Sequence, residues 1–387
     1  MARNFRPKAR LEIRRGNNNQ VALLRGPIVC RGLECENLRH SMPPIDARKR
    51  VIDRLIFRKG IKIPYGKQFE IMTNDKPDDE WPSLPYGEWA DTCEALHLWT
   101  QIVGKVRLAQ TPWLNHSWQA PLYVTSRGLT TGPVPHGRRY FDMEFDFVEH
   151  VLRLRSDANA IALPLRPMAV AEFYAQVMGG LDALKTPVSI FAAPNEMADS
   201  VPFARDTGLR PYDREHAYRF WRVLLQADRI LKAFRTAFLG KASPVHFFWG
   251  SFDLAVTRFS GRRAPRHPGG VPHLPDAVVR EAYSHEVSSA GFWPGGPGGQ
   301  DAAFYSYAYP EPPGFREKPV SAKDAYFDPN LGEFLLPYAR LRKSADPEAE
   351  IMGFLAATYE AAADNGKWDR ANLECAIGTA GRPRPVP

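Results

Sequence analysis

The stretch with the most evident chemical potential is rich in aromatic and ionisable residues and spans residues 243–309. It begins with SPVHFFWGSFDLAVTRFSGRRAP (243–265) and continues through REAYSHEVSSAGFWPGG (280–296) to AFYSYAYPEP (303–312). A polar side chain that is buried among large rings needs a hydrogen-bonding partner, either another residue or a ligand. The pattern therefore predicts a cavity lined by polar groups and rings in the second half of the chain.

Two histidines and two carboxyl groups in this stretch could transfer protons. We predict that His246 or His285 exchanges the proton, because imidazole titrates near neutral pH, and that Glu286 or Asp253 orients it. Successive side chains of an extended strand point to opposite faces, so His285 and Glu286 serve one site only if the strand bends. The alternative is that both histidines are hydrogen-bonded core residues without a catalytic role.

Basic residues in the same stretch predict an anionic ligand. Arg258 and Arg262 are the candidate clamp, because a guanidinium group binds carboxylate or phosphate through two parallel hydrogen bonds. No Asp or Glu occurs between Leu254 and Pro275 to neutralise them. A solvated basic loop is the alternative interpretation.

Further candidate ligand-binding residues come from the rings of this stretch and from a helix near the start of the body. Trp249, Tyr305 and Tyr307 are predicted to line the cavity, and buried phenols need hydrogen-bonding partners. His97 and Lys105 lie on a polar row of the predicted helix 88–107, which either meets water or lines the pocket.

Several familiar sites are excluded by their spacing. No phosphate-binding glycine loop opens a helix, and Ser289 stands where a zinc-protease motif starting at His285 requires its second histidine. Ser251 lacks the second glycine of a nucleophile elbow. A metal site built from His97, His246, His285 and Asp253 is conceivable, but the spacing does not require one. We predict no metal, and the sequence identifies no cofactor.

The elements that would position these residues indicate an α+β fold, with antiparallel sheets and helices packed on one face. Asp142, Glu144 and Asp146 alternate with apolar residues in strand 141–147, and we expect them to pair with Arg153 and Arg155 of strand 151–155. Gly250-Ser251 is predicted to bend the aromatic stretch. The helix–strand pattern recurs, which is consistent with two similar halves. The other expected elements are strands at 121–126, 161–165 and 188–192 and helices at 167–184, 213–240 and 346–366.

Charge and composition divide the 387 residues into four predicted regions. Residues 1–71 carry 17 Lys and Arg against 6 Asp and Glu, whereas the remainder has a net charge of −3. We expect a basic, disordered or non-native leader, with translation of the natural protein starting at Met72. The regions that follow are a helix-and-sheet half at 72–200, an aromatic-rich half that carries the pocket at 201–376, and a disordered tail at 377–387.

The composition also restricts the partners. The net charge of the body argues against nucleic-acid binding there, although the leader could act as a basic arm. No apolar run is long enough to cross a membrane, and no export signal is visible, so we expect a soluble cytoplasmic protein. The four cysteines show no disulfide or zinc pattern. The oligomeric state is not determined by the sequence.

The chain from about Trp81 to Trp368 resembles a bacterial family known only as a domain of unknown function. The resemblance covers nearly all of the body and excludes residues 1–71. It implies no activity and assigns no catalytic residue. Two classes therefore stay open: a protein that binds, and as an enzyme transforms, a small anion, or a non-catalytic binding or scaffold protein whose aromatic stretch is an interaction surface. The resemblance rests on LHLWTQIVGKVRLAQTPWLNHSW (96–118), PLYVTSRGLTTGPVP (121–135) and the three segments quoted above.

Overall fold

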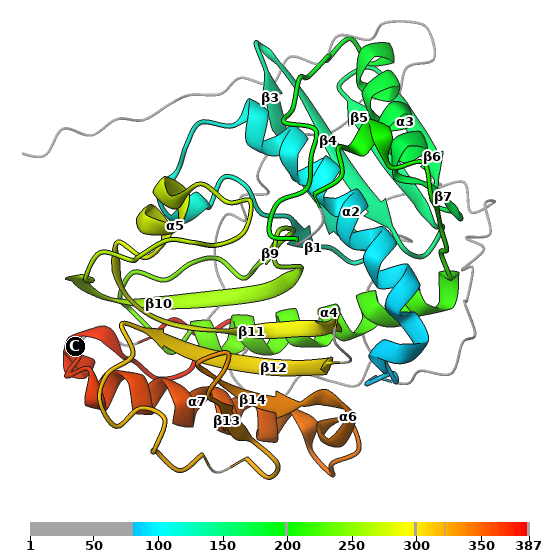
Figure 1. Ribbon diagram of the computed structural model, residues 1–387. Helices are drawn as coiled ribbons and strands as arrows, with labels where there is room; N and C mark the ends of the chain where they lie inside the picture. Colours follow the sequence, from blue (N-terminus) through cyan, green and yellow to red (C-terminus); the bar gives the residue numbers. More distant parts are fainter. Residues whose placement is uncertain (1–79, 198–199, 298–299, 321, 385–387) are drawn as a thin grey trace, which may run out of the picture. The chain divides into compact units, whose positions relative to one another are not determined.

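A long helix, α2 (Tyr86–Gln110), precedes both sheets in the chain and packs against elements of each half (Figure 1). Our computed structural model describes residues 80–197, 200–297, 300–320 and 322–384, all of which belong to one unit. The predicted leader at 1–71 and the predicted start at Met72 lie outside these residues. The helix expected at 88–107 is confirmed and is slightly longer, and most of its side chains from Trp89 to Val106 are buried.

The N-terminal half contains an antiparallel sheet of six strands in the order β1-β2-β4-β5-β6, with β3 also paired to β4. The aromatic ring of Phe173 from helix α3 (Val170–Ala183) stacks on Trp99 of α2 at 4.9 Å and on Phe145 of β4 at 6.3 Å. These rings hold the apolar face of the sheet against both helices. The strands are β1 (Tyr123–Val124), β2 (Gly128–Thr130), β3 (Val134–His136), β4 (Arg139–Asp146), β5 (Val151–Ser156) and β6 (Ala160–Pro164).

The outer face of this sheet carries the predicted ladder of acids and arginines. Asp142 is directly opposite Arg155, and Glu144 is opposite Arg153. The Arg155 guanidinium donates to Asp142 at 2.6 Å and to Glu144 at 2.8 Å. The alternation of apolar and charged residues in β4 therefore predicted both the register and the exposed face correctly.

The strand predicted at 188–192 is wrong. Val188 packs into the core, but no neighbouring strand is available, and this segment is part of a connection between α3 and α4. Its hydrogen bonds go elsewhere: the Ala192 carbonyl, for example, accepts from the amide of Phe203. The connection also contains η2 (Phe203–Arg205) and β8 (Leu209–Arg210), which pairs with β7 (Met168–Ala169).

The C-terminal half contains a second antiparallel sheet of six strands, in the order β13-β14-β12-β11-β10-β9. Gly250 and Ser251 lie in the turn that joins its first two strands, so the predicted bend is confirmed and reverses the chain completely. The strands are β9 (His246–Phe248), β10 (Asp253–Arg263), β11 (His285–Gly296), β12 (Gln300–Tyr309), β13 (Tyr326–Asp328) and β14 (Glu333–Pro337).

Helices α4 (Arg214–Arg235) and α7 (Pro347–Asn365) pack along one face of this second sheet (Figure 1). Asp213 caps α4 by accepting from the amide of His216 at 2.9 Å, and Asp346 caps α7 from Ala349 at 2.9 Å. The caps confirm both predicted helix starts, although α4 ends before the expected 240. Shorter helical segments are η1 (Asn115–Ser117), α5 (Asp276–Ala282), α6 (Tyr338–Leu341) and α8 (Arg370–Leu373).

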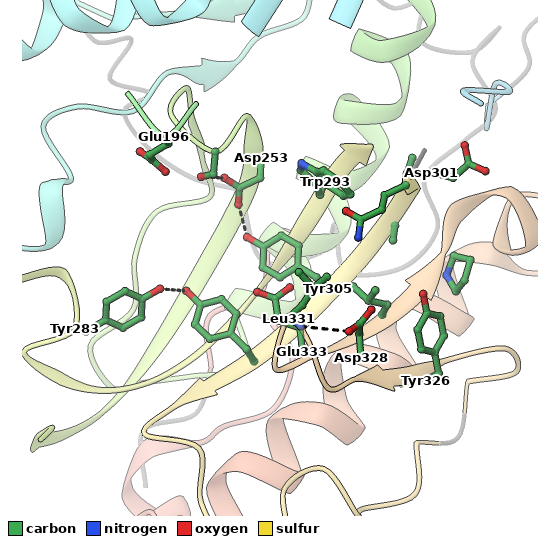
Figure 2. Close-up of a pocket in the computed structure, with 17 residues that line it drawn as sticks. Glu196, Asp253, Tyr283, Trp293, Asp301, Tyr305, Tyr326, Asp328, Leu331 and Glu333 are labelled. Carbon is green, nitrogen blue, oxygen red and sulfur yellow. Dashed lines mark hydrogen bonds between the residues drawn. The ribbon is translucent and has the colours of Figure 1, made fainter. Parts of the chain in front are cut away.

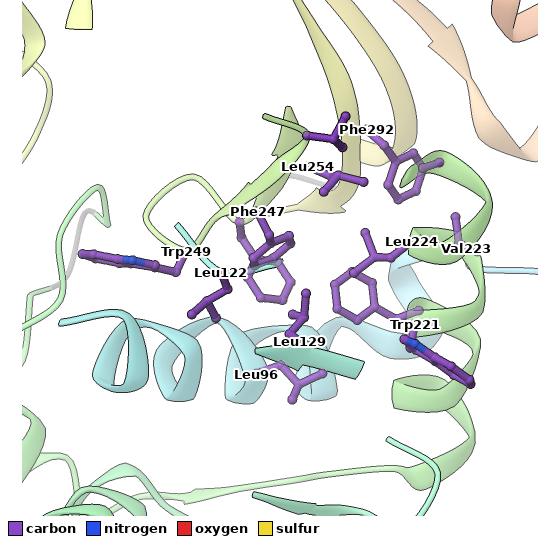
Figure 3. Close-up of a cluster of buried hydrophobic side chains, with 14 of the residues drawn as sticks. Leu96, Leu122, Leu129, Trp221, Val223, Leu224, Phe247, Trp249, Leu254 and Phe292 are labelled. Atoms are coloured by element: carbon purple, nitrogen blue, oxygen red, sulfur yellow. The ribbon is translucent and has the colours of Figure 1, made fainter. Parts of the chain in front are cut away.

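The two sheets meet at a buried apolar cluster between α2 and α4 (Figure 3). Leu122, just before β1, and Phe247 of β9 exchange two backbone hydrogen bonds, of 2.9 and 2.8 Å. Leu96, Leu224 and Leu254 pack around this bridge, and all are fully buried. The α+β class is confirmed, with one six-stranded sheet on each side of the bridge. The predicted domain division near residue 200 stays a prediction.

Candidate functional site

A cavity of about 570 Å³ lies over one face of the C-terminal sheet (Figure 2). Residues directly opposite one another in neighbouring strands share a face, and Gly291, Tyr305 and Leu335 occupy such positions. We call this the cavity face, and the opposite face, which α4 and α7 cover, the helix face. The lining consists of Glu196, Ser251, Asp253, Tyr283, Trp293, Gln300, Asp301, Ala302, Ala303, Tyr305, Tyr307, Tyr326, Asp328, Leu331, Glu333, Leu335 and Pro337.

The described lining of the cavity is acidic. It contains five carboxyl groups and no lysine, arginine or histidine. Asp301 accepts from the amide of Tyr86 at 2.9 Å, and Asp328 accepts from the amides of Asn330 and Leu331. These two aspartates therefore also fix the local backbone. The other three acids are Glu196, Asp253 and Glu333.

Asp253 is a buried part of the lining and is held by two hydroxyl groups. Ser251 donates to it at 2.7 Å, and Tyr305 donates through a short hydrogen bond. Burial raises the pKa of Asp253, although both hydroxyl groups oppose this shift. The Tyr305 ring crosses directly over Gly291, where a Cβ atom would lie 2.5 Å from the phenol oxygen. A glycine is needed there for Tyr305 to reach Asp253.

A second pair of phenols continues the wall. Tyr307 stacks on Tyr305 with ring centroids 6.2 Å apart, and its hydroxyl is 2.9 Å from that of Tyr283. Burial is the largest cause that raises the pKa of Tyr283, and the charges of Glu333, Asp253 and Glu196 raise it further. All three acids therefore surround the same space as this phenol.

Glu196 and Glu333 are the two acids without hydrogen-bond donors on their side chains, within the part of the chain that the structure describes. Burial, followed by repulsion from Asp253, raises the pKa of each to about 7. Lys105 opposes this rise at Glu196, whereas Asp328 adds to it at Glu333. Both groups therefore titrate near neutral pH.

The polar row of α2 holds the loop that carries Glu196. The Gln101 side chain donates to the carbonyl of Asn195 and accepts from its amide, both at 2.8 Å, and Lys105 donates to the Asn195 side chain. His97 bonds to the carbonyl of Gly250 at 2.8 Å. His97 and Lys105, predicted to bind ligand, thus lie behind the lining and position it.

The two predicted clamp arginines do not reach the cavity. Arg258 is five positions from Asp253 in β10, and side chains alternate, so it points to the helix face. Arg258 is 3% exposed there. Its guanidinium carbon lies 3.5 Å from the ring centroid of Phe234, and the guanidinium group donates to the backbone carbonyl of Phe234. Arg262 forms an ion pair with Glu286 at 2.6 Å at the surface.

The predicted proton-transfer histidines also lie apart from the cavity. His246 is completely buried beside Phe248, with ring centroids 4.4 Å apart, and its pKa is lowered by burial to about 4. The ring centroid of His285 lies 6.0 Å from that of His116. Burial, followed by the charge of Lys241, lowers the pKa of His285. Their catalytic roles stay predictions that no contact with the cavity supports.

Of the eleven predicted site residues, the structure brings Asp253, Tyr305 and Tyr307 together in the lining. Trp249 is buried nearby but donates to the carbonyl of Ala120. Sequence reasoning missed Glu196 entirely. It also did not select the acids and rings that strands β11, β12, β13 and β14 contribute, where the available signal was a cluster of carboxyl and aromatic residues: Trp293, Asp301, Tyr326, Asp328 and Glu333.

The described residues form neither a membrane-spanning helix nor a metal-binding cluster. None of their helices combines the length and apolar character that crossing a bilayer requires. Among the same residues, no group of three or more His, Cys, Asp and Glu side chains is arranged to hold a metal ion.

Comparison with known proteins gives a family and no activity. No curated protein and no solved structure matches the chain. The model of a family described as "Family of unknown function (DUF5996)" matches residues 81–375, which contain both sheets and the whole cavity lining. The chain therefore belongs to the DUF5996 family.

Proposed function

We propose that the cavity over the C-terminal sheet binds a small organic cation. The observation that carries this proposal is the presence of five carboxyl groups in the described lining with no basic side chain among them. Ionised carboxyl groups in a half-buried site repel one another, and a bound cation relieves this repulsion. The volume of about 570 Å³ is in the usual range for small-molecule sites.

The aromatic wall favours an organic cation over a bare metal ion. Tyr283, Tyr305 and Tyr307 stand beside the acids, and Trp293 and Tyr326 complete the lining. Ring faces attract alkylammonium groups, whereas hard metal ions prefer several oxygen ligands at fixed geometry. Rings and acids together therefore suit an amine with an apolar body.

The anion predicted from the sequence is not favoured by these contacts. Arg258 lies on the helix face, and Arg262 is paired with Glu286. An anion in the cavity would lie among carboxyl groups without a compensating donor from a described basic side chain. The predicted location of a small-molecule site in the aromatic half is retained in our proposal, and the charge of the ligand is reversed.

Three probes of equal length test the charge preference: butylamine, butan-1-ol and butanoate. At pH 8, where Glu196 and Glu333 are mostly ionised, millimolar butylamine should raise the midpoint of thermal unfolding, by mass action on the folded state. Butan-1-ol and butanoate should leave the midpoint unchanged. Stabilisation by butanoate alone would refute the proposal.

A matched pair of variants locates the effect. Glu333→Gln removes one charge from the lining, and Glu317→Gln removes one from an exposed residue outside it. Calorimetric titration with butylamine should show weaker binding, by about tenfold, in the first variant, which corresponds to the loss of one charge contact. The second variant should bind as the unaltered protein does. Equal binding by all three proteins would place the amine elsewhere.

A further inference from the structure

The acids of the cavity are of two kinds, and the difference bears on the ligand. Asp301 and Asp328 accept backbone amides, and Asp253 accepts two hydroxyl groups. Glu196 and Glu333 have no such donors among the described residues. The two glutamates are therefore the carboxyl groups of the lining with the largest hydrogen-bonding capacity left for a ligand.

The two glutamates approach the cavity from different elements. Glu196 comes from the loop between α3 and α4, and Glu333 begins β14. Figure 2 shows Asp253 and Tyr305 between them. Asp253 raises the pKa of both, yet neither glutamate contributes to the shift of the other. With Asp253 and Tyr305 between them, they form two separate carboxyl positions, of which Glu196 also lies within the field of Lys105.

The space between the two positions is bordered by rings. Tyr305 and Tyr307 are stacked, with an angle of 18° between their planes, and they present a continuous apolar surface. The Tyr307 hydroxyl is next to that of Tyr283, and the charges of both glutamates raise the pKa of the Tyr283 phenol. Methylene groups can pack along such a surface while charged ends reach the acids on either side.

From this arrangement we infer that the ligand is an aliphatic diamine, with one ammonium group at Glu196, the other at Glu333 and its methylene chain along Tyr305 and Tyr307. The inference rests on the proposed function and narrows it from one positive charge to two. Asp253 is less available to an ammonium group, because Ser251 already donates to one of its oxygens and Tyr305 to the other.

Two ligands of the same length test the second charge: 1,4-diaminobutane and 4-aminobutan-1-ol. Calorimetric titrations of the full chain at pH 8 should show the diamine binding at least about tenfold more tightly. Glu196→Gln and Glu333→Gln should each abolish this advantage, so that the two ligands bind within about twofold of each other. Glu317→Gln, the exposed control, should retain the full advantage. Far-UV circular dichroism confirms that each variant is folded.

The possible outcomes separate this inference from the proposed function. Equal binding of both ligands to the unaltered protein overturns the diamine and leaves the single cation in place. An advantage that survives in both glutamine variants also overturns it, because the second charge then contacts other groups. Failure of both amines to bind overturns the proposed function as well.

Discussion

The two faces of the C-terminal sheet differ in whether their buried charged side chains have hydrogen-bonding partners. On the helix face, Arg258 is enclosed by the rings of Phe234 and Tyr359, with its guanidinium carbon 3.5 and 4.4 Å from their centroids. It also donates to a backbone carbonyl. On the cavity face, Glu196 and Glu333 have no donor within the described chain.

This difference distinguishes structural from functional charge. A buried charge with partners holds the fold together, and removing it leaves those partners unsatisfied. A half-buried charge without a hydrogen-bond donor destabilises the fold unless a ligand supplies one, and our proposal assigns that situation to Glu196 and Glu333. Strand β10 contributes to both faces, because successive residues alternate: Arg258 lies on the helix face and Asp253 on the cavity face.

The largest effect is expected on the helix face. Arg258→Ala should lower the free energy of unfolding by about 3 kcal/mol, because the ring contacts and the hydrogen bond to Phe234 are lost together. Urea unfolding followed by circular dichroism measures this change. Arg262→Ala, whose ion pair is at the surface, should cost less than about 1 kcal/mol. An equal loss of unfolding free energy in both variants would contradict the idea that the buried contacts of Arg258 stabilise the fold more than the surface ion pair of Arg262.

The pH dependence of the free energy of unfolding should reflect the ionisation of the two glutamates that line the cavity. Glu196 and Glu333 have pKa values of about 7 when folded and ordinary values near 4.5 when unfolded, so the folded state binds more protons between these values. Stability is therefore greatest below about pH 4.5 with respect to these groups and is lost as the pH rises through about 7. Because both side chains are partly exposed, we expect a loss of about 2 kcal/mol for the pair.

Urea titrations between pH 5 and pH 8 measure this slope. The double variant Glu196→Gln with Glu333→Gln should flatten it, because neither replacement ionises. An unchanged slope in the double variant would assign the pH dependence to other groups.

Gly291→Ala should disturb the cavity through its backbone. The added Cβ atom would lie 2.2 Å from the carbonyl oxygen of Leu254 and 2.5 Å from the Tyr305 hydroxyl, which forces both to move. We expect a loss of about 1.5 kcal/mol in chemical unfolding. Gly179→Ala, in helix α3 with open space around its Cβ position, should instead stabilise by about 0.5 kcal/mol. A neutral result at Gly291 would show that the ring can shift freely.

The smallest change concerns a single hydroxyl group. Tyr305→Phe removes one of the two donors to Asp253 and should cost about 1 kcal/mol in thermal or urea unfolding. Tyr326→Phe removes a hydroxyl from a ring that is 49% exposed and should be neutral. Similar values for both would indicate that Asp253 finds a replacement donor.

Local patterns predicted much of the fold. The alternation in β4 identified the ladder of Asp142 and Arg155, and the acids before α4 and α7 identified both caps. These features depend on neighbours within a few residues. The segment 188–192 shows the limit, because its alternation records packing and a strand also needs a partner strand.

The site was less predictable, for two different reasons. Arg258 could have been excluded, because it is an odd number of positions from Asp253 and a regular strand places the two on opposite faces. Glu196 could not have been found, since its place depends on the contacts of Asn195 with Gln101, 94 residues apart. Glu333 lines the same cavity as Asp253, 80 residues away in sequence (333 − 253), because of the pairing of β14 with β12.

Trp293 gives the protein an intrinsic optical reporter. Its indole is part of the cavity wall, so the emission of this ring depends on whether solvent or another molecule lies against it. The chain has nine tryptophans, and the difference between the spectra of the unaltered protein and Trp293→Phe isolates this contribution. Occupancy of the cavity can therefore be followed by fluorescence quenching, without a label and in a crude mixture of candidate molecules.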